Sequence, residues 1–172
     1  DSSVGGKTAI NMPGGKNLVG TFYQPDQVII DPSVLTTLPP EEIRSGLGEV
    51  IKYGLIDEPE IFEMALSNTE EILEAEDQNF FLEVIPRCCN IKSNIVQQDE
   101  RDRGLRQILN FGHTIGHAIE AAHGYGRIKH GDAVLWGILG ESWLSRERGE
   151  ISEVDFNRIK NGIAKFGLPS LE

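Results

Sequence analysis

The chain has 172 residues, which is enough for one domain of ordinary size with a hydrophobic core. Lys and Arg number 16 and Asp and Glu number 27, so the formal net charge is −11. This charge argues against nucleic acid or an anionic membrane surface as a partner, because both are bound largely through cationic side chains. Hydrophobic residues at 39% and charged residues at 25% are typical of a globular chain rather than a disordered one.

The sequence contains no apolar run of about 18 residues, so we expect no transmembrane helix. Its first residues lack the basic start and apolar stretch of a signal peptide. Cys88 and Cys89 are adjacent, and adjacent cysteines rarely form a disulfide of ordinary geometry, which favours a reducing, cytoplasmic compartment. Because the chain opens at Asp1, in a stretch typical of a loop, we expect it to be a piece of a longer protein.

The N-terminal part differs in composition from the rest. Residues 1–38 are rich in Gly, Pro and β-branched residues, including the run Val28-Ile29-Ile30, and predict loops and short strands. From Pro39 onward the apolar spacing is helical. The expected helices are one starting at Pro39-Pro40, one with Pro59 in its first turn, a short one capped by Thr69, and one from Asp77 to Gln98 that Pro86 should kink or divide.

The second half continues the helical pattern after a charged turn over residues 101–106. The expected helices run from Asn110 to about Ala122, from His130 to about Arg148, and from a Ser152 cap to a stop at Gly167. Together, these expected helices predict a mainly α protein. A helical domain over residues 39–172 follows a short β-containing arm over residues 1–38.

All four histidines lie between residues 113 and 130. His113 and His117 are four residues apart, on one face of a predicted helix, and His130 opens the next helix. Imidazole is the commonest transition-metal ligand, so this spacing by itself indicates His113 and His117 as a ligand pair. The alternative is that both are hydrogen-bonded core residues and that Gly112 and Gly116 allow close helix packing.

A catalytic zinc usually has three protein ligands and one open position. Glu49 is the candidate third ligand, because it stands on an otherwise apolar helix with Lys52 one turn further on. The alternative is that Glu49 and Lys52 form a solvated pair. Five cations with Gly or Asn nearby could form an anion site if they converge: Lys7, Lys16, Lys52, Lys92 and Arg106.

The segment Gly5-Gly6-Lys7-Thr8 resembles the end of a nucleotide-binding P-loop. That motif requires glycine where Asp1 stands, so we reject an NTPase.

Several stretches taken together resemble the 3-dehydroquinate synthase family. They are DSSVGGKTAIN, GKNLVGTFYQP, LTTLPPEEIRSGLGEVIKYGLI, NIKSNIVQQDERDRGLR and LNFGHTIGHAIE, followed by HGDAV, in an order and spacing that are highly specific. The resemblance implies that the chain is the back half of such an enzyme, and that the family's N-terminal α/β domain with its Gly-rich NAD loop is absent from it. It also implies a small phosphorylated sugar acid as substrate and a homodimer as the full-length assembly.

Members of this family convert the seven-carbon sugar-acid phosphate DAHP into 3-dehydroquinate and phosphate, in the shikimate route to aromatic amino acids. The resemblance therefore implies NAD, which oxidises the substrate transiently and is regenerated, and a zinc or cobalt ion. The implied metal ligands are Glu49, His113 and His130, whereas His117 corresponds to a position that faces the substrate.

Further roles follow from the same resemblance. The positions expected around the substrate phosphate are Lys7, Asn17 and His117; those at its carboxylate and ring oxygens are Lys92, Arg106 and Asn110; and Lys52 lies near the metal. The positions expected around NAD are Asp1, Lys7 and Lys16 near the nicotinamide and ribose, and the segment Val34-Leu35-Thr36-Thr37.

Three alternatives remain open. Iron-dependent alcohol dehydrogenases share a histidine-rich metal site, but they use Asp as first ligand and lack the lysine pair of GGKT…GKN. Related sugar-phosphate cyclases keep the metal ligands and alter the carboxylate contacts, whereas Arg106 and Asn110 favour an acid substrate. The third alternative is a catalytically silent metal-binding fragment, and we expect the isolated chain to show no turnover.

Overall fold

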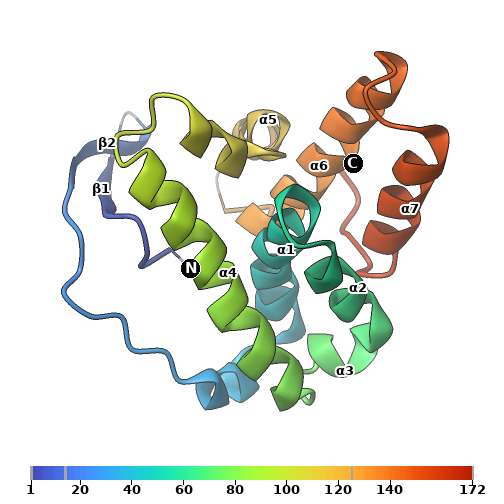
Figure 1. Ribbon diagram of the computed structural model, residues 1–172, viewed down its shortest axis with the longest axis horizontal. Coiled ribbons are helices and arrows are strands. Elements are labelled where there is room, and N and C mark those ends of the chain that lie inside the picture. The colour runs from blue at the N-terminus through green and yellow to red at the C-terminus, as the bar shows by residue number, and fades with distance from the viewer. Residues whose placement is uncertain (1, 14, 125, 172) are drawn as a thin grey trace.

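A two-stranded antiparallel hairpin forms the N-terminal arm of the computed structural model, and helices form the rest (Figure 1). The structure describes residues 2–13, 15–124 and 126–171, without the side chains at positions 11 and 15–17. The strands are β1 (Lys7–Met12) and β2 (Gly15–Phe22), and Lys7 pairs with Phe22. The helices are η1 (Pro32–Thr37), α1 (Pro40–Ile56), α2 (Pro59–Ser67), α3 (Thr69–Leu73), α4 (Gln78–Gln98), η2 (Leu105–Asn110), α5 (His113–His123), α6 (His130–Glu147) and α7 (Glu153–Ala164).

The prediction of a mainly α fold with a β-containing arm is confirmed. After β2, residues 23–31 run without regular structure along one side of the molecule and lead to η1, which packs against α4 (Figure 1). The run Val28-Ile29-Ile30 forms no strand, and its side chains are exposed, Ile29 at 90%. Asp31 accepts a hydrogen bond from the Ser33 amide and so starts η1, a short 3₁₀ helix that the sequence patterns did not predict.

Most helix starts follow the predicted capping rules. Proline occupies the first turn of α1 and α2, where its missing N–H costs nothing. Asp77 accepts from the Phe80 amide at the start of α4, and Ser152 accepts from the Asp155 amide at the start of α7.

Two predictions about helix ends and interruptions are wrong: the Thr69 cap, and the division of the helix at Pro86; the kink at Pro86 stays a prediction. Thr69 is the first residue of α3 rather than its cap, and its hydroxyl donates to the Ala65 carbonyl in the preceding helix. α4 runs undivided through Pro86. Pro86 has no N–H to donate to the carbonyl of Leu82, four residues earlier. Leu82 is exposed, so water can donate to this carbonyl instead.

The helix predicted from Asn110 begins at His113 instead. Asn110 ends the 3₁₀ helix η2, and Gly112 has a φ of +79°, a left-handed conformation that interrupts the helical path. This break places His113 at the very start of α5, and the position matters for the site described below.

Helix α1 lies at the centre of the helical part and contacts α2, α3, α4, α6 and η2 (Figure 1). Its inward-facing residues Ile43, Leu47 and Ile51 are at most 4% exposed. Helix α6 packs against α1, α5 and α7, so α1 and α6 together hold the bundle in place. Side chains on α1, α5 and α6 therefore stand on helices that pack directly against one another.

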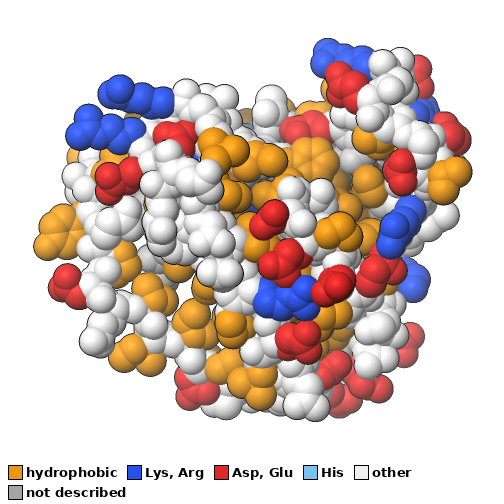
Figure 2. Space-filling model, viewed as in Figure 1, with side chains coloured by type: hydrophobic (Ala, Val, Ile, Leu, Met, Phe, Trp, Pro, Cys, Tyr) orange, Lys and Arg blue, Asp and Glu red, His pale blue; other side chains and the backbone are white. Residues whose placement is uncertain are grey.

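Charge and apolar surface are unevenly distributed. In Figure 2 acidic side chains gather over α2 and α3, and hydrophobic side chains gather over the linker and η1. The arm and linker expose many large apolar residues, among them Ile10, Leu18, Val19, Phe22, Tyr23 and Ile29. Within the described ranges, none of the helices has the length and apolar character needed to cross a membrane.

Candidate metal centre

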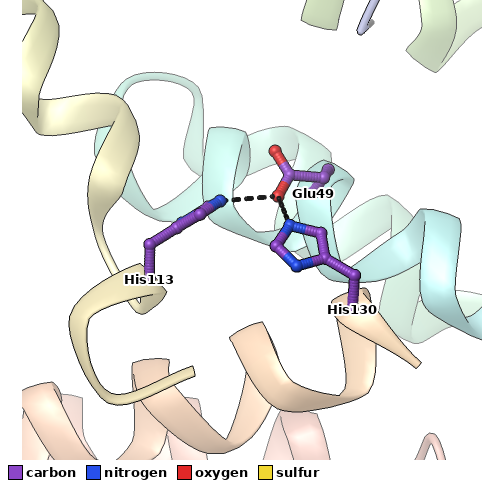
Figure 3. Close-up of side chains that lie close together, drawn as sticks. All are labelled: Glu49, His113 and His130. Carbon is purple, nitrogen blue, oxygen red and sulfur yellow. Dashed lines mark ion pairs between the residues drawn. The ribbon is translucent and has the colours of Figure 1, made fainter. Parts of the chain in front are cut away.

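Three side chains from three helices converge at one point (Figure 3). Glu49 comes from α1, and His113 and His130 are the first residues of α5 and α6. The Nε2 atoms of His113 and His130 lie 3.3 Å and 3.8 Å from Oε1 of Glu49. That oxygen is buried and has no hydrogen-bond partner among the described residues. One carboxylate oxygen and two imidazole nitrogens, all within 4.8 Å of one another, fit a zinc or cobalt ion.

Backbone-to-backbone packing brings the three helices this close. A Cβ atom on Gly131, the residue after His130, would lie 1.7 Å from the Ser45 carbonyl oxygen of α1. A Cβ on Gly116 of α5 would lie 3.0 Å from the Ala133 carbonyl oxygen of α6. A Cβ on Gly112 would lie 2.7 Å from the Val134 carbonyl oxygen of α6, so the alternative that these glycines allow close helix packing is confirmed for both Gly112 and Gly116. This packing brings the histidines to Glu49.

The His113 ring has a defined tautomer. Its Nδ1 lies 3.2 Å from the Phe111 carbonyl oxygen. A carbonyl oxygen can only accept, so Nδ1 carries a hydrogen. Nε2, which is directed at Glu49, offers its lone pair to a metal once it carries no hydrogen of its own. This is the form in which an imidazole binds a metal.

Glu49 is held in its ionised form by its neighbours. Nζ of Lys52 lies 2.5 Å from Oε2 of Glu49, and Lys52 is only 2% exposed. The alternative of a solvated Glu49–Lys52 pair is therefore wrong. Burial raises the pKa of Glu49, but His113 and Lys52 outweigh it and lower the pKa to about 2. The carboxylate is thus available as an anionic ligand at every physiological pH.

His117 lies one turn along α5 from His113. Its ring centroid is 5.5 Å from that of His113 and 5.8 Å from that of His130. It does not share a ligand group with Glu49; instead it forms a second possible group with Glu120 and His130. The sequence patterns missed Glu120, although an acid seven residues after His113 lies on the same helix face.

The predicted cations converge beside this centre. Lys7, Lys52, Lys92 and Arg106 line one cavity of about 190 Å³. Other residues around it are Asn110, Glu49, His113 and Tyr53. Asp1 lies outside the described residues, as do the side chains of Lys16 and Asn17, which belong to β2. A locally positive cavity can hold an anion despite the net charge of −11.

Arg106 is fixed by backbone carbonyls. It is 3% exposed, and its guanidinium donates to Gly5 O at 2.9 Å and Glu100 O at 2.8 Å. These bonds tie the N-terminal arm to the end of α4 and to η2. The ammonium group of Lys7 pairs with Asp102 in the same region. The arm is therefore attached to the helical part through cavity residues.

Lys92 gives the cavity a dependence on pH. Burial and the nearby Lys52 charge lower the pKa of Lys92 to about 8. Lys92 is therefore charged below pH 8 and neutral above it, so we expect sulfate, whose charge is constant over this range, to bind about tenfold more weakly at pH 9 than at pH 7. Calorimetric titration should show that Lys92→Gln binds sulfate weakly at both pH values. The exposed Lys160→Gln on α7 should behave as wild type, and the same pH slope in both variants would contradict the assignment.

The predicted NAD segment forms η1. Leu35 lines an apolar cavity of about 270 Å³ between η1, α1 and α4. Val34 is 58% exposed, and the Thr36 and Thr37 hydroxyls donate to carbonyls within η1. Glu49 and Tyr53 line both this apolar cavity and the cationic one, so the two adjoin at the metal centre.

The fold matches the helical C-terminal part of sugar-phosphate cyclases. The NAD⁺- and Zn²⁺-bound 2-epi-5-epi-valiolone synthase of Streptomyces hygroscopicus is 27% identical, with a TM-score of 0.89 over 98% of this chain and 47% of its own. The structure of 2-deoxy-scyllo-inosose synthase with carbaglucose-6-phosphate, NAD⁺ and Co²⁺ is 30% identical, with a TM-score of 0.85 over 99% of this chain and 47% of its own.

The chain belongs to the 3-dehydroquinate synthase family. Residues 46–172 match the family's C-terminal model and residues 1–45 its N-terminal model. Curated 3-dehydroquinate synthases of Nitrosospira multiformis and Pelobacter propionicus are 50% and 49% identical over 98% and 99% of this chain. The matches cover 46% and 47% of those relatives, so the chain spans about half of their length.

Proposed function

We propose that this chain is the metal- and substrate-binding half of a 3-dehydroquinate synthase, which converts DAHP into 3-dehydroquinate and phosphate. The observation that carries the proposal is the meeting of Glu49, His113 and His130 beside a cavity lined by Lys7, Lys52, Lys92 and Arg106. A substrate with both a carboxylate and a phosphate requires such a concentration of positive charge. Curated relatives at about half identity carry the same function in their names.

The residues of this chain would bind and orient the substrate. Glu49, His113 and His130 would hold the zinc or cobalt ion, which supplies a Lewis acid for a substrate oxygen that alternates between alcohol and carbonyl. Arg106 and Lys92 would bind the carboxylate with Asn110, and Lys7 and His117 the phosphate with Asn17. Since Arg106 is already fixed by two carbonyls, it would bind an anion without first being ordered.

NAD would supply a transient oxidant that makes the adjacent C–H acidic enough to break. We place its nicotinamide at the junction of the apolar and cationic cavities, near Leu35 of the segment Val34–Thr37 and near Lys7. Asp1 and Lys16 stay predictions for the same cofactor. Both solved relatives named above contain NAD⁺ with a divalent metal.

A cyclase acting on a non-acidic sugar phosphate is the second candidate, because the solved 2-deoxy-scyllo-inosose synthase holds carbaglucose-6-phosphate. Arg106 and Lys92 beside the metal centre favour the acid substrate.

The family match sets aside the iron-dependent alcohol dehydrogenases. The reducing, cytoplasmic compartment stays a prediction, as does the homodimer that the family implies.

The proposal is tested by restoring the other half of the enzyme. We expect no phosphate release from DAHP by the 172-residue chain alone with NAD and zinc. When the chain is joined to the N-terminal half of the Nitrosospira multiformis relative, phosphate and 3-dehydroquinate should form. A folded chimera that binds zinc and NAD but cyclises only non-acidic sugar phosphates would contradict the proposal.

The His117→Ala variant distinguishes a role in substrate binding from a role in metal binding. In the same chimera, His117→Ala should lower kcat about 10- to 100-fold, because a hydrogen bond to a charged phosphate is worth about 1.5–3 kcal/mol. Zinc content measured by metal analysis should stay at the wild-type level. Loss of zinc together with the loss of kcat would show that His117 is itself a metal ligand.

A further inference from the structure

Glu120 is a buried acid that the proposed function leaves unexplained. It lies on α5 and is 3% exposed. A carboxylate removed from water costs several kcal/mol unless charges or hydrogen bonds compensate it. Its Oε2 lies 3.3 Å from Nδ1 of His130, the first residue of α6. The buried charge is therefore directed at the metal-ligating ring.

The two nitrogens of the His130 ring face different partners. Nδ1 faces Glu120 at 3.3 Å, and Nε2 faces Glu49 at 3.8 Å. An ionised carboxylate only accepts hydrogen bonds, so Nδ1 carries the hydrogen and Nε2 offers its lone pair to the metal centre. His113 has the same arrangement, with a backbone carbonyl in place of the carboxylate. Both ligand rings are thus oriented through Nδ1.

His130 needs such a partner more than His113 does. Its side chain is 45% exposed, against 15% for His113, and it stands at the start of α6 directly after a loop. Packing alone cannot fix a ring that is nearly half exposed. Gly116 lies against α6 at Ala133, and Glu120 is one turn further along the same face of α5. The close packing of α5 on α6 therefore sets the distance between Glu120 and His130.

We propose that Glu120 is a positioning residue of the metal centre, which fixes the tautomer and orientation of His130 and so raises metal affinity. This inference rests on the proposed metal site. Carboxylate partners of metal-bound histidines typically change metal affinity 10- to 100-fold when they are replaced. Glu120 acts through His130 and not on the ion itself.

Zinc affinity of the full 172-residue chain tests this role, measured by competition with a chromophoric chelator. Glu120→Gln keeps the shape of the side chain and removes its charge, so we expect about one zinc per chain with affinity 10- to 100-fold lower. The visible absorption spectrum of the cobalt-loaded variant should change as well, because a neutral amide no longer raises the basicity of the His130 ring as the carboxylate does. A purely structural role for Glu120 would lower the thermal stability of the metal-free chain and leave this spectrum unchanged.

Asp132→Asn provides the matched control. Asp132 is 1% exposed in the first turn of α6, and it pairs with Arg44 instead of a histidine. This variant should lose stability and keep zinc affinity within about threefold, and an equal loss of affinity in both variants would overturn the proposal.

The second ligand group gives another decisive outcome. Two zinc ions per wild-type chain, one of them lost in both Glu120→Gln and His117→Ala, would mean that Glu120 is itself a ligand, and the proposal would be wrong. Unchanged zinc affinity in Glu120→Gln would overturn this inference alone. A wild-type chain that binds no zinc would overturn the metal site as well.

Discussion

Glu49→Gln and His113→Ala are each expected to lower zinc affinity more than about 100-fold, beyond the effect of removing a residue that only supports a ligand. Each change removes one of three protein ligands, and two ligands rarely hold zinc. Glu49→Gln is preferred to alanine because the glutamine still offers an oxygen to the buried Lys52 ammonium. Chelator competition and metal analysis of the purified variants measure the loss.

His123→Ala is the matched control for these two variants. His123 lies on α5 with His113, but its ring contacts the carbonyls of Ile119 and Leu171 at the other end of the helix. It should keep the wild-type zinc content. Retention of zinc by both Glu49→Gln and His113→Ala would exclude the proposed ligand set.

Gly131→Ala is expected to destabilise the fold by about 3 kcal/mol or more, the upper range for forcing extra atoms into a packed core. The added Cβ would lie 1.7 Å from the Ser45 carbonyl oxygen, so α6 must move away from α1. Because Glu49 and His130 lie on these two helices, zinc affinity should fall together with stability. Urea unfolding of the metal-free chain and zinc competition measure the two effects.

Gly46→Ala tests whether this effect is specific to the close contact. Gly46 lies within α1, and nothing stands within 4 Å of the position its Cβ would take. Alanine should therefore stabilise the chain by about 0.5–1 kcal/mol through its higher helix propensity. A Gly131→Ala variant as stable as wild type would contradict the close packing of α1 on α6.

The fold could be predicted largely from local signals. Pro40 and Pro59 in first turns, and the Asp77 and Ser152 caps, act within one turn of the chain, so their patterns predicted the right helices. The break before His113 could not be predicted, because it depends on the left-handed conformation of Gly112 and its contact with α6. The division expected at Pro86 does not occur, because exposure to water at Leu82, a tertiary property, makes the proline tolerable.

The sequence, with the family resemblance, predicted which residues form the candidate site. It did not predict the contacts that hold those residues in place. Spacing alone favoured His113 and His117, and the family resemblance was needed to choose His130 and Glu49. The burial of Lys52 and the fixing of Arg106 by carbonyls depend on segments far apart in the chain, which no spacing rule connects. Glu120 was overlooked because an acid in a helix next to histidines is more often solvated.

Diffraction at the zinc absorption edge, from crystals of the zinc-loaded chain, tests the central claim most directly. We expect one anomalous peak about 2.0–2.2 Å from a Glu49 oxygen and from Nε2 of His113 and His130. A peak bound by His117 and Glu120 without Glu49, or no peak between the three helices, would contradict the account.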